Sequence, residues 1–420
     1  MNRIVVGAPS VECHGVWTEL SAPVEIGGEQ DRMWFRVPSD VPVHPRLEPF
    51  IVSLFSTAMH RQADFEVTGE LSPALIEGLH TVQTIYTTWY PDSRRFTVRG
   101  YRPGVPPAAP GLRVASFFSG GVDAFHTALR HRETVTDLVL VHGFDIPLVR
   151  TALRQRISAS LRHAAAGLGK RLIEVETNSR EITERHVSWT YQQFGNALIG
   201  VGHALGGTVR RVLIPSSETY RHLDPLGSHP MTDPHLGSEC LAVTHDSADR
   251  TRDEKTDLVA TSDTALQHLR VCFKNPDDTY NCGRCEKCVR TMLNLLAAGA
   301  LDRCTAFPLP LTPTLIHQVE IPADIVLYHA EANLKRLEAR GTDPSIILAV
   351  RDLVLRYRQH MAGRTLGALS RLDTRSPELV EAITRHEQEL MGILLGRGHA
   401  NLFRLWARLI KAGFIRRLQR

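Results

Sequence analysis

The sequence predicts an α/β fold with a doubly wound parallel sheet, preceded by an N-terminal α+β domain and followed by a helical C-terminal region. Between residues 114 and 215, short apolar runs alternate with helical stretches, which is typical of a parallel sheet covered on both faces. A glycine pair stands between the first apolar run and the first helical stretch. Four of the seven cysteines fall within residues 272–288, which indicates a separate metal-binding element.

Changes in composition and periodicity along the chain predict four regions. Prolines at 103, 106, 107 and 110 form a stiff joint between the first two of them. The regions are an α+β domain at 1–105, an α/β domain at 111–270, a four-cysteine knuckle at 271–310 and helices at 321–420.

The α/β region contains four expected strands and three expected helices. Apolar runs bounded by turn residues predict the strands, and apolar residues at helical spacing predict the helices. The segment 215–246 lacks clear periodicity, and we expect a functional loop there. The strands are expected at 114–118, 138–142, 171–176 and 209–215, and the helices at 122–131, 149–168 and 187–205.

The composition is that of an ordinary globular protein. Hydrophobic residues make up 43% and charged residues 22% of the 420 positions, and the net charge is +4. Six basic residues and no acid lie in 401–420, so the rest of the chain is close to neutral and demands no nucleic-acid partner. The start of the chain lacks the apolar core of a secretory signal, and no apolar run is long enough to span a bilayer. We therefore expect a cytoplasmic protein.

The strongest local signal is the segment Ser119-Gly120-Gly121-Val122-Asp123-Ala124. Two glycines let the backbone turn tightly and bring its N–H groups close to an anion, and the following helix adds the positive end of its dipole. Ser119 can donate a hydroxyl, and Asp123 can orient Mg²⁺ or a water. The chain lacks the Walker pattern GxxxxGK[ST], so this is a phosphate loop of another type.

Ser119–Asp123 resembles the SGGxDS signature of the PP-loop ATP pyrophosphatase superfamily, which has a HUP-type Rossmann-like fold. The resemblance implies that the loop holds the β- and γ-phosphates of ATP. It also implies that the enzyme adenylates a carboxyl, carbonyl or amide oxygen with release of pyrophosphate. The last serine of the signature is Ala124 here, which removes one hydroxyl donor worth about 1 kcal/mol.

Cys272, Cys282, Cys285 and Cys288 have the spacing of a metal knuckle. Two consecutive CxxC steps present several sulfurs to one ion, and Cys272 can complete a tetrahedron. We expect a structural Zn²⁺ that performs no chemistry, because four protein ligands leave no open position. An iron–sulfur cluster is the alternative, since four thiolates also suit one.

The loop and the knuckle together are similar to the 7-cyano-7-deazaguanine synthase family, which converts a carboxylate into a nitrile with ATP and ammonia. The matching knuckle runs from Cys272 to Arg290, and the likeness covers about residues 111–300. The family pattern T/S-K-x-E implies a lysine that reaches the phosphates, and Lys255 with Arg252 lies at a comparable place. The resemblance also implies that Val141, His142 and Gly143 line the base pocket.

Other polar residues follow the fourth strand. Glu218 or Asp233 is a candidate general base for an amine or ammonia. Cys240 is a candidate persulfide carrier, although a lone cysteine is more often a buried apolar residue.

The resemblance implies an AMP-forming ligase that makes an amide, a nitrile or a related C–N product on a small molecule. Two alternatives remain: a sulfur transferase acting on tRNA or a small molecule, and a non-catalytic nucleotide- or RNA-binding module. For the amphipathic segment 401–420 we favour packing on its own domain or in a homodimer over binding to tRNA or an acidic membrane surface.

Overall fold

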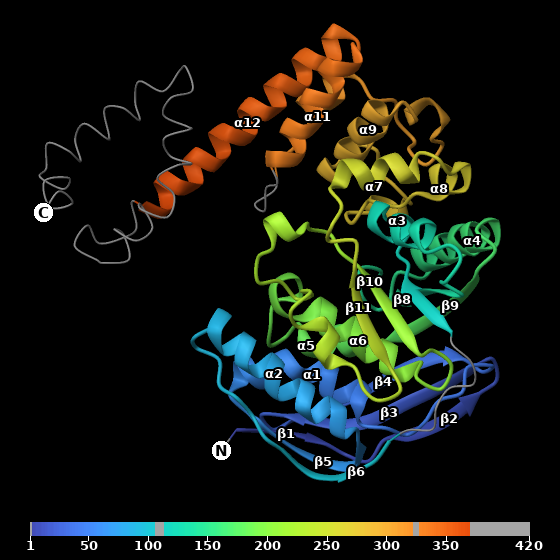
Figure 1. Ribbon diagram of the computed structural model, residues 1–420, viewed down its shortest axis with the longest axis vertical. Helices are drawn as coiled ribbons and strands as arrows, with labels where there is room; N and C mark the ends of the chain where they lie inside the picture. The colour runs from blue at the N-terminus through green and yellow to red at the C-terminus, as the bar shows by residue number, and fades with distance from the viewer. Residues whose placement is uncertain (1, 106–112, 322–326, 370–420) are drawn as a thin grey trace, which may run out of the picture. The chain divides into compact units, whose positions relative to one another are not determined.

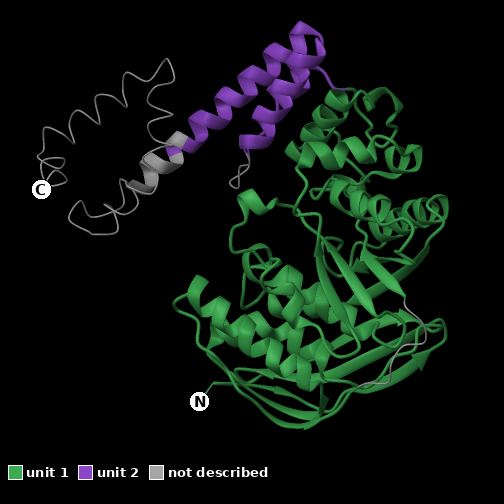
Figure 2. Ribbon diagram, viewed as in Figure 1, with its two compact units in different colours: residues 1–310 green, residues 311–420 purple. Residues whose placement is uncertain are grey.

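The structure is a computed structural model that describes residues 2–105, 113–321 and 327–369. The chain forms two compact units, residues 1–310 and 311–420 (Figure 2). Three of the four prolines of the expected joint, at 106, 107 and 110, and the basic segment 401–420 lie outside the described residues, whereas Pro103 is the last residue of a strand.

The first unit is built on one mixed sheet of eleven strands (Figure 1). The strands are β1 Arg3–Val6, β2 Ser10–His14, β3 Trp17–Ile26, β4 Glu29–Pro38, β5 Asp64–Leu71, β6 Val98–Pro103, β7 Val114–Phe117, β8 Asp137–His142, β9 Arg171–Thr177, β10 Arg211–Pro215 and β11 Ala242–Asp246. Their order is β11-β10-β7-β8-β9-β4-β3-β1-β5-β6, with β2 paired to β3.

The sheet is parallel in one half and mixed in the other. β11, β10, β7, β8 and β9 run parallel, which confirms the predicted α/β region. β4 joins β9 in antiparallel orientation, and β3 pairs antiparallel with β4, β2 and β1. β1, β5 and β6 are again parallel. The prediction of a purely parallel sheet was therefore wrong for the whole sheet, because the strands of the first 105 residues extend it with antiparallel pairs.

Helices cover both faces of the parallel half. Along β8, Leu138 and Leu140 belong to one apolar cluster and Val139 to another, as expected when successive side chains point to opposite faces. The first cluster contains apolar residues of α3 Val122–Arg130, α4 Thr151–Gly167, α7 Arg252–Val259 and α8 Asp263–His268. The second contains those of α1 Glu48–Arg61, α2 Pro73–Trp89 and α6 Phe194–Ala204.

Two expectations within 187–246 differ from the structure. The expected single helix over 187–205 is interrupted, because the turn η1 Trp189–Gln193 is a π-helix that precedes α6. The segment expected to be irregular ends in a strand, β11, which pairs with β10 over five residues. β11 is short and half polar, so only its pairing with β10 makes it a strand.

Six further elements complete the described part of the first unit. They are α5 Ser179–Thr183, η2 Tyr220–His222, η3 Asp233–Leu236, η4 Pro276–Asp278, α9 Glu286–Ala298 and η5 Leu301–Arg303.

The second unit is helical where it is described, as predicted. It contains α10 Pro313–His317, α11 Leu327–Arg340 and α12 Pro344–Leu369. Arg356 on α12 donates hydrogen bonds to the carbonyls of Ile316 and Val319, which ties α12 to the end of α10.

Candidate functional site

The predicted phosphate loop lies between β7 and α3, and its backbone requires glycine. Gly120 has φ +80°, and a Cβ there would lie 2.8 Å from Leu161 Cδ2. The Arg270 amide donates a hydrogen bond to the Gly120 carbonyl at 2.7 Å, which holds the turn in place. A larger residue at position 120 would be strained and would also clash.

The loop ends at the N-terminus of α3. Gly121 is the N-cap residue, and it has no side chain to occupy the first N–H groups of the helix. Ser119 is exposed, whereas Val122 and Ala124 are buried against the core. Backbone N–H groups and one hydroxyl are therefore available at the turn, while the Ala124 side chain belongs to the packing of α3.

Two cations converge on Asp123 in the first turn of α3. Arg252 Nη1 lies 2.9 Å from Asp123 Oδ2, and Lys255 Nζ lies 3.4 Å from Asp123 Oδ1. Burial raises the pKa of Asp123, but the charges of Arg252 and Lys255 outweigh it and hold that pKa below its usual range. The carboxylate is therefore ionised at neutral pH, and the structure brings together the three residues predicted to be catalytic.

Lys255 is fixed by its surroundings. Its side chain is fully buried, and Nζ donates to the Ser216 carbonyl at the end of β10 at 2.6 Å. A capping box between Thr251 and Glu254 begins α7 and sets the direction of the helix that carries Arg252 and Lys255. The ammonium group therefore joins α7, β10 and the phosphate loop at one point.

Two further residues near the loop were not predicted. The Arg270 guanidinium is buried beneath the loop, with Nη1 3.5 Å from the Ser119 carbonyl, and its Nε has no hydrogen-bond partner among the described residues. Burial and then the charge of Lys255 lower the pKa of His126 to about 4, so this histidine is neutral at pH 7. Neither residue belongs to a recognisable motif. Arg270 reaches the loop only through folding, whereas His126 follows the loop by two residues on α3.

The predicted base-pocket residues lie at the end of β8. Val141 is half-buried, and Gly143 has φ +100° where a Cβ would overlap the Thr177 carbonyl. The buried His142 places Nε2 3.1 Å from Ser158 Oγ and 3.3 Å from Glu174 Oε2. At this nitrogen His142 therefore serves the packing of α4 against β9.

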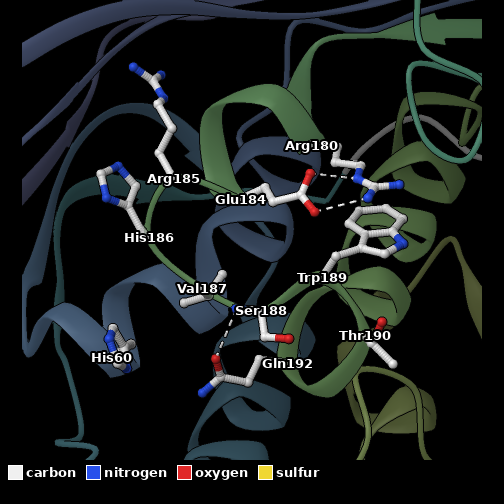
Figure 3. A pocket seen from close by; sticks show the side chains of 10 residues that line it. All are labelled: His60, Arg180, Glu184, Arg185, His186, Val187, Ser188, Trp189, Thr190 and Gln192. Carbon is white, nitrogen blue, oxygen red and sulfur yellow. Dashed lines mark hydrogen bonds and ion pairs between the residues drawn. The ribbon is translucent and has the colours of Figure 1, made fainter. Parts of the chain in front are cut away.

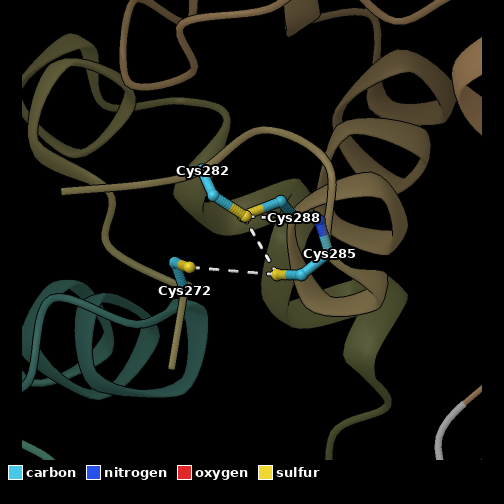
Figure 4. Close-up of side chains that lie close together, drawn as sticks. All are labelled: Cys272, Cys282, Cys285 and Cys288. Carbon is cyan, nitrogen blue, oxygen red and sulfur yellow. Dashed lines mark hydrogen bonds between the residues drawn. The ribbon is translucent and has the colours of Figure 1, made fainter. Parts of the chain in front are cut away.

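The four predicted metal ligands come together (Figure 4). The Sγ atoms of Cys272, Cys282, Cys285 and Cys288 all lie within 4.8 Å of one another, and all four residues are buried. Hydrogen bonds from Cys285 and Cys288 lower the pKa of Cys272, which favours a thiolate. These residues fit a metal ion.

Backbone N–H groups and one asparagine hold the knuckle. The amides of Asn275 and Cys285 donate to the sulfurs of Cys272 and Cys282, at 3.2 and 3.3 Å. Asn281 Oδ1 accepts from the Cys272 amide at 3.1 Å, and its Nδ2 donates to the carbonyls of Leu269 and Ala306. The knuckle is therefore shaped by the chain around it.

Helix α9 connects the knuckle to the phosphate loop. It begins directly after Cys285, its N-cap residue. Further along α9, Arg290 contributes to lowering the pKa of Asp123, and Thr291 Oγ1 lies 3.5 Å from Arg252 Nη2. An ion at the knuckle would thus fix the start of the helix that packs beside the charged cluster.

A separate open hollow of about 540 Å³ lies beside η1 (Figure 3). The Arg180 guanidinium stacks 4.4 Å from the Trp189 ring centre and forms two hydrogen bonds with Glu184, at 2.8 and 2.9 Å. Burial, followed by the charges of Arg61 and Arg185, lowers the pKa of His186. None of the lining residues belongs to the phosphate loop.

No protein-family model matches the chain, and no curated protein or solved structure shows significant similarity to it. In the described part of the chain, every helix is too short or too polar to cross a bilayer.

Proposed function

We propose that the protein is an ATP-dependent, AMP-forming ligase that joins a nitrogen nucleophile to a small-molecule carboxylate or carbonyl. The observation that carries the proposal is the convergence of Arg252 and Lys255 on Asp123, directly behind a glycine turn that begins a helix. Cations, free N–H groups and a helix N-terminus are the groups that bind and stabilise a leaving diphosphate.

Each residue has a role in the proposed reaction. An oxygen of the substrate's carboxylate or carbonyl attacks the α-phosphorus of ATP, and the bond from that phosphorus to pyrophosphate breaks. Lys255 and Arg252 neutralise the pyrophosphate as it leaves, and the N–H groups of the loop with Ser119 hold it. Asp123, ionised because of its two cationic neighbours, would hold Mg²⁺. The nitrogen nucleophile then attacks the activated carbon, and AMP leaves.

For the knuckle we propose a single Zn²⁺ in a structural role. Four sulfurs about 2.3 Å from one central ion lie roughly 3.8 Å apart. Three of the six sulfur pairs, at 3.4 and 3.9 Å, match that spacing, and all six lie within 4.8 Å. An iron–sulfur cluster spreads its four thiolates over two or four irons and therefore needs a wider set.

The sulfur-transfer alternative is less well supported. Cys240, its candidate persulfide carrier, is only 5% exposed, and a persulfide must reach its acceptor. We therefore favour C–N bond formation.

The nucleotide products test the proposal. The protein is incubated with ATP labelled at the α-phosphate, Mg²⁺, ammonium and the small-molecule fraction of a cell extract, and the nucleotides are separated. We expect AMP and pyrophosphate; ADP with phosphate, or binding without turnover, would exclude a ligase of this kind. Asp123→Asn should abolish AMP formation, and Asp40→Asn, at an exposed carboxylate, is the matched control that should not.

The metal is tested separately by elemental analysis and absorption spectroscopy. We expect one zinc per chain and no visible absorption, with the zinc lost in Cys285→Ser and retained in the control Cys13→Ser, at an exposed thiol. A brown protein containing iron would favour the cluster instead.

A further inference from the structure

A three-residue segment joins the phosphate loop to the cysteine knuckle. Arg270, Val271 and Cys272 follow one another in the chain. The Arg270 amide donates a hydrogen bond to the Gly120 carbonyl at 2.7 Å, and Cys272 supplies one of the four sulfurs of the knuckle. One residue therefore separates the backbone group that holds the glycine turn from a predicted metal ligand.

Asn281 holds this segment in place. Its Oδ1 accepts hydrogen bonds from the amides of Val271 and Cys272, at 3.0 and 3.1 Å. Asn281 is buried and directly precedes Cys282, a second cysteine of the knuckle. The backbone that follows Arg270 is thus fixed by a residue whose own position depends on the knuckle.

The side chain of Arg270 makes a second connection between the two sites. It is only 5% exposed. Nη1 lies 3.5 Å from the Ser119 carbonyl oxygen, and Nη2 lies 3.5 Å from Asn275 Oδ1. The Asn275 amide donates in turn to Cys272 Sγ at 3.2 Å. A path of contacts therefore runs from the first residue of the loop, through one guanidinium and one asparagine, to a sulfur of the knuckle.

Asn275 has the conformation and the orientation that this path requires. Its φ is +36°, on the left-handed side of the map, where asparagine is more common than most other residues. Its Nδ2 donates to the carbonyls of Thr279 and Tyr280, each at 2.9 Å. These two bonds fix the carboxamide, which leaves Oδ1 as the acceptor on the side of Arg270.

The glycine turn depends on such anchors, because glycine loses more conformational freedom on ordering than any other residue. A loop whose N–H groups are held in place before an anion arrives binds that anion more tightly than a loop that must first be ordered. The segment that holds Gly120 ends at Cys272, and a thiolate site of this kind gains its order from the ion that it binds. The order of the turn and the occupancy of the knuckle therefore depend on each other.

We propose that a metal ion at the knuckle and a nucleotide at the phosphate loop bind cooperatively. The contacts of Arg270 and Asn275 couple the two sites, and both act as positioning residues. This rests on the proposed function, because it takes a nucleotide to be the ligand of the loop. Coupling is reciprocal, so the nucleotide raises the affinity for the metal by the same factor as the metal raises that for the nucleotide.

The coupling factor is measured at equilibrium on the full-length, zinc-loaded protein. Zinc affinity is determined by competition with a zinc-selective chelator, with Mg²⁺ throughout and with or without saturating α,β-methylene-ATP. This analogue cannot be cleaved between its α- and β-phosphates, so the measurement requires no turnover. We expect the analogue to raise the zinc affinity by about 5–150-fold, the range of typical couplings. Calorimetric titration of the analogue at high and low zinc should give the same factor.

Two substitutions interrupt the path and leave all four cysteines in place. Arg270→Met removes the guanidinium, and Asn275→Gly keeps the left-handed backbone and its amide while removing the carboxamide. Both variants should still hold one zinc per chain, whereas the coupling factor should fall at least about threefold. Arg284→Met is the control, because it removes an equal charge from an exposed arginine within the knuckle and should leave the coupling unchanged.

Binding of the analogue to the wild type without a change in zinc affinity would overturn the proposal. An undiminished factor in either Arg270→Met or Asn275→Gly would do the same, since coupling that arises only from unfolding of the zinc-free protein would persist in them. A loss of equal size in Arg284→Met would trace the effect to charge alone and would also overturn the proposal. A wild type that binds no α,β-methylene-ATP at any zinc concentration would instead disprove the nucleotide site on which the proposed function depends.

Discussion

Two buried ion networks in the first unit differ in how completely they are paired. In the N-terminal half, Arg46 binds Glu48 through two nitrogens, at 2.6 and 3.2 Å, and also binds Glu70 and the Gly104 carbonyl. Glu48 accepts the Ser72 amide as well. Every nitrogen of Arg46 therefore has a partner inside the protein, and this network is closed.

The network at the phosphate loop is open by comparison. Arg252 and Lys255 share Asp123 beside a glycine turn, while Arg270 Nε and His126 Nδ1 have no hydrogen-bond partner among the described residues. Buried polar atoms are normally paired, and those that are not tend to mark functional sites. The comparison teaches that burial alone does not complete the pairing of a charged group: the partners of Arg46 satisfy all of its nitrogens, whereas Arg270 and His126 each keep one unpaired nitrogen.

The largest effect is expected from a substitution that disrupts the closed network around Arg46. Arg46→Met leaves Glu48 buried without its cation and should lower the free energy of unfolding by about 3–5 kcal/mol. Denaturant titration measures this. Arg3→Met removes an exposed pair with Glu66 and should cost at most about 1 kcal/mol. Similar losses in both variants would remove the distinction between buried and exposed pairs.

The next largest effect is expected from a substitution in the open network beside Asp123. Lys255→Met should slow AMP formation by about 10²–10³-fold, because it removes one cation from the leaving pyrophosphate. The rate of AMP release at saturating ATP measures it. Lys170→Met, on a half-buried side chain that donates to the Arg132 carbonyl, is the control. A normal rate in Lys255→Met would show that the open network does not serve catalysis.

A third prediction concerns acid stability at Glu174, a closed ion site between β9 and α4. Burial raises the pKa of Glu174, but hydrogen bonds from His142 and Ser158 and the charge of Arg162 lower it to about 2. A depressed folded-state pKa gives stability that is complete above the unfolded pKa near 4.5 and lost as the pH falls towards 2. Glu174→Gln should flatten the loss of stability in that window, as measured by urea titration at several pH values. An unchanged slope would contradict this.

The smallest effect is expected from a substitution in the glycine turn, which tests whether the turn contributes to ATP binding. Gly120→Ala adds a methyl at φ +80° and 2.8 Å from Leu161, so it should cost about 1–2 kcal/mol of stability and weaken ATP binding. Gly169→Ala has a similar φ of +66° and open space around it. It should show the backbone cost without any change in ATP affinity, as measured by calorimetry. Equal ATP affinities in the two variants would separate the turn from nucleotide binding.

Much of the α/β region could be predicted because its signals are local. β7, α3, β8, α4 and β9 follow from apolar runs and helical spacing within a few residues of the expected bounds. The four cysteines could be assigned to one site because two CxxC steps leave few other arrangements. Arg252 and Lys255 were predicted, through a family pattern, to reach the phosphates, and the structure places both within 3.4 Å of Asp123.

The rest depended on contacts between distant segments. β11 carries no clear strand pattern and exists because β10 offers a free edge. The union of the N-terminal strands with the parallel sheet depends on two residue pairs between β4 and β9. Arg270 lies in a stretch without a motif, and only folding places it beside the phosphate loop.

The sequence by itself determined the glycine turn, the cysteine knuckle and the alternation of strands and helices, because each depends on residues close together in the chain. Only the tertiary structure decided which buried charges are closed and which are open. Pairing is a property of all the groups that surround a charge. Around Arg46 those groups come from positions up to 58 residues away, and Arg252 and Asp123 are 129 residues apart.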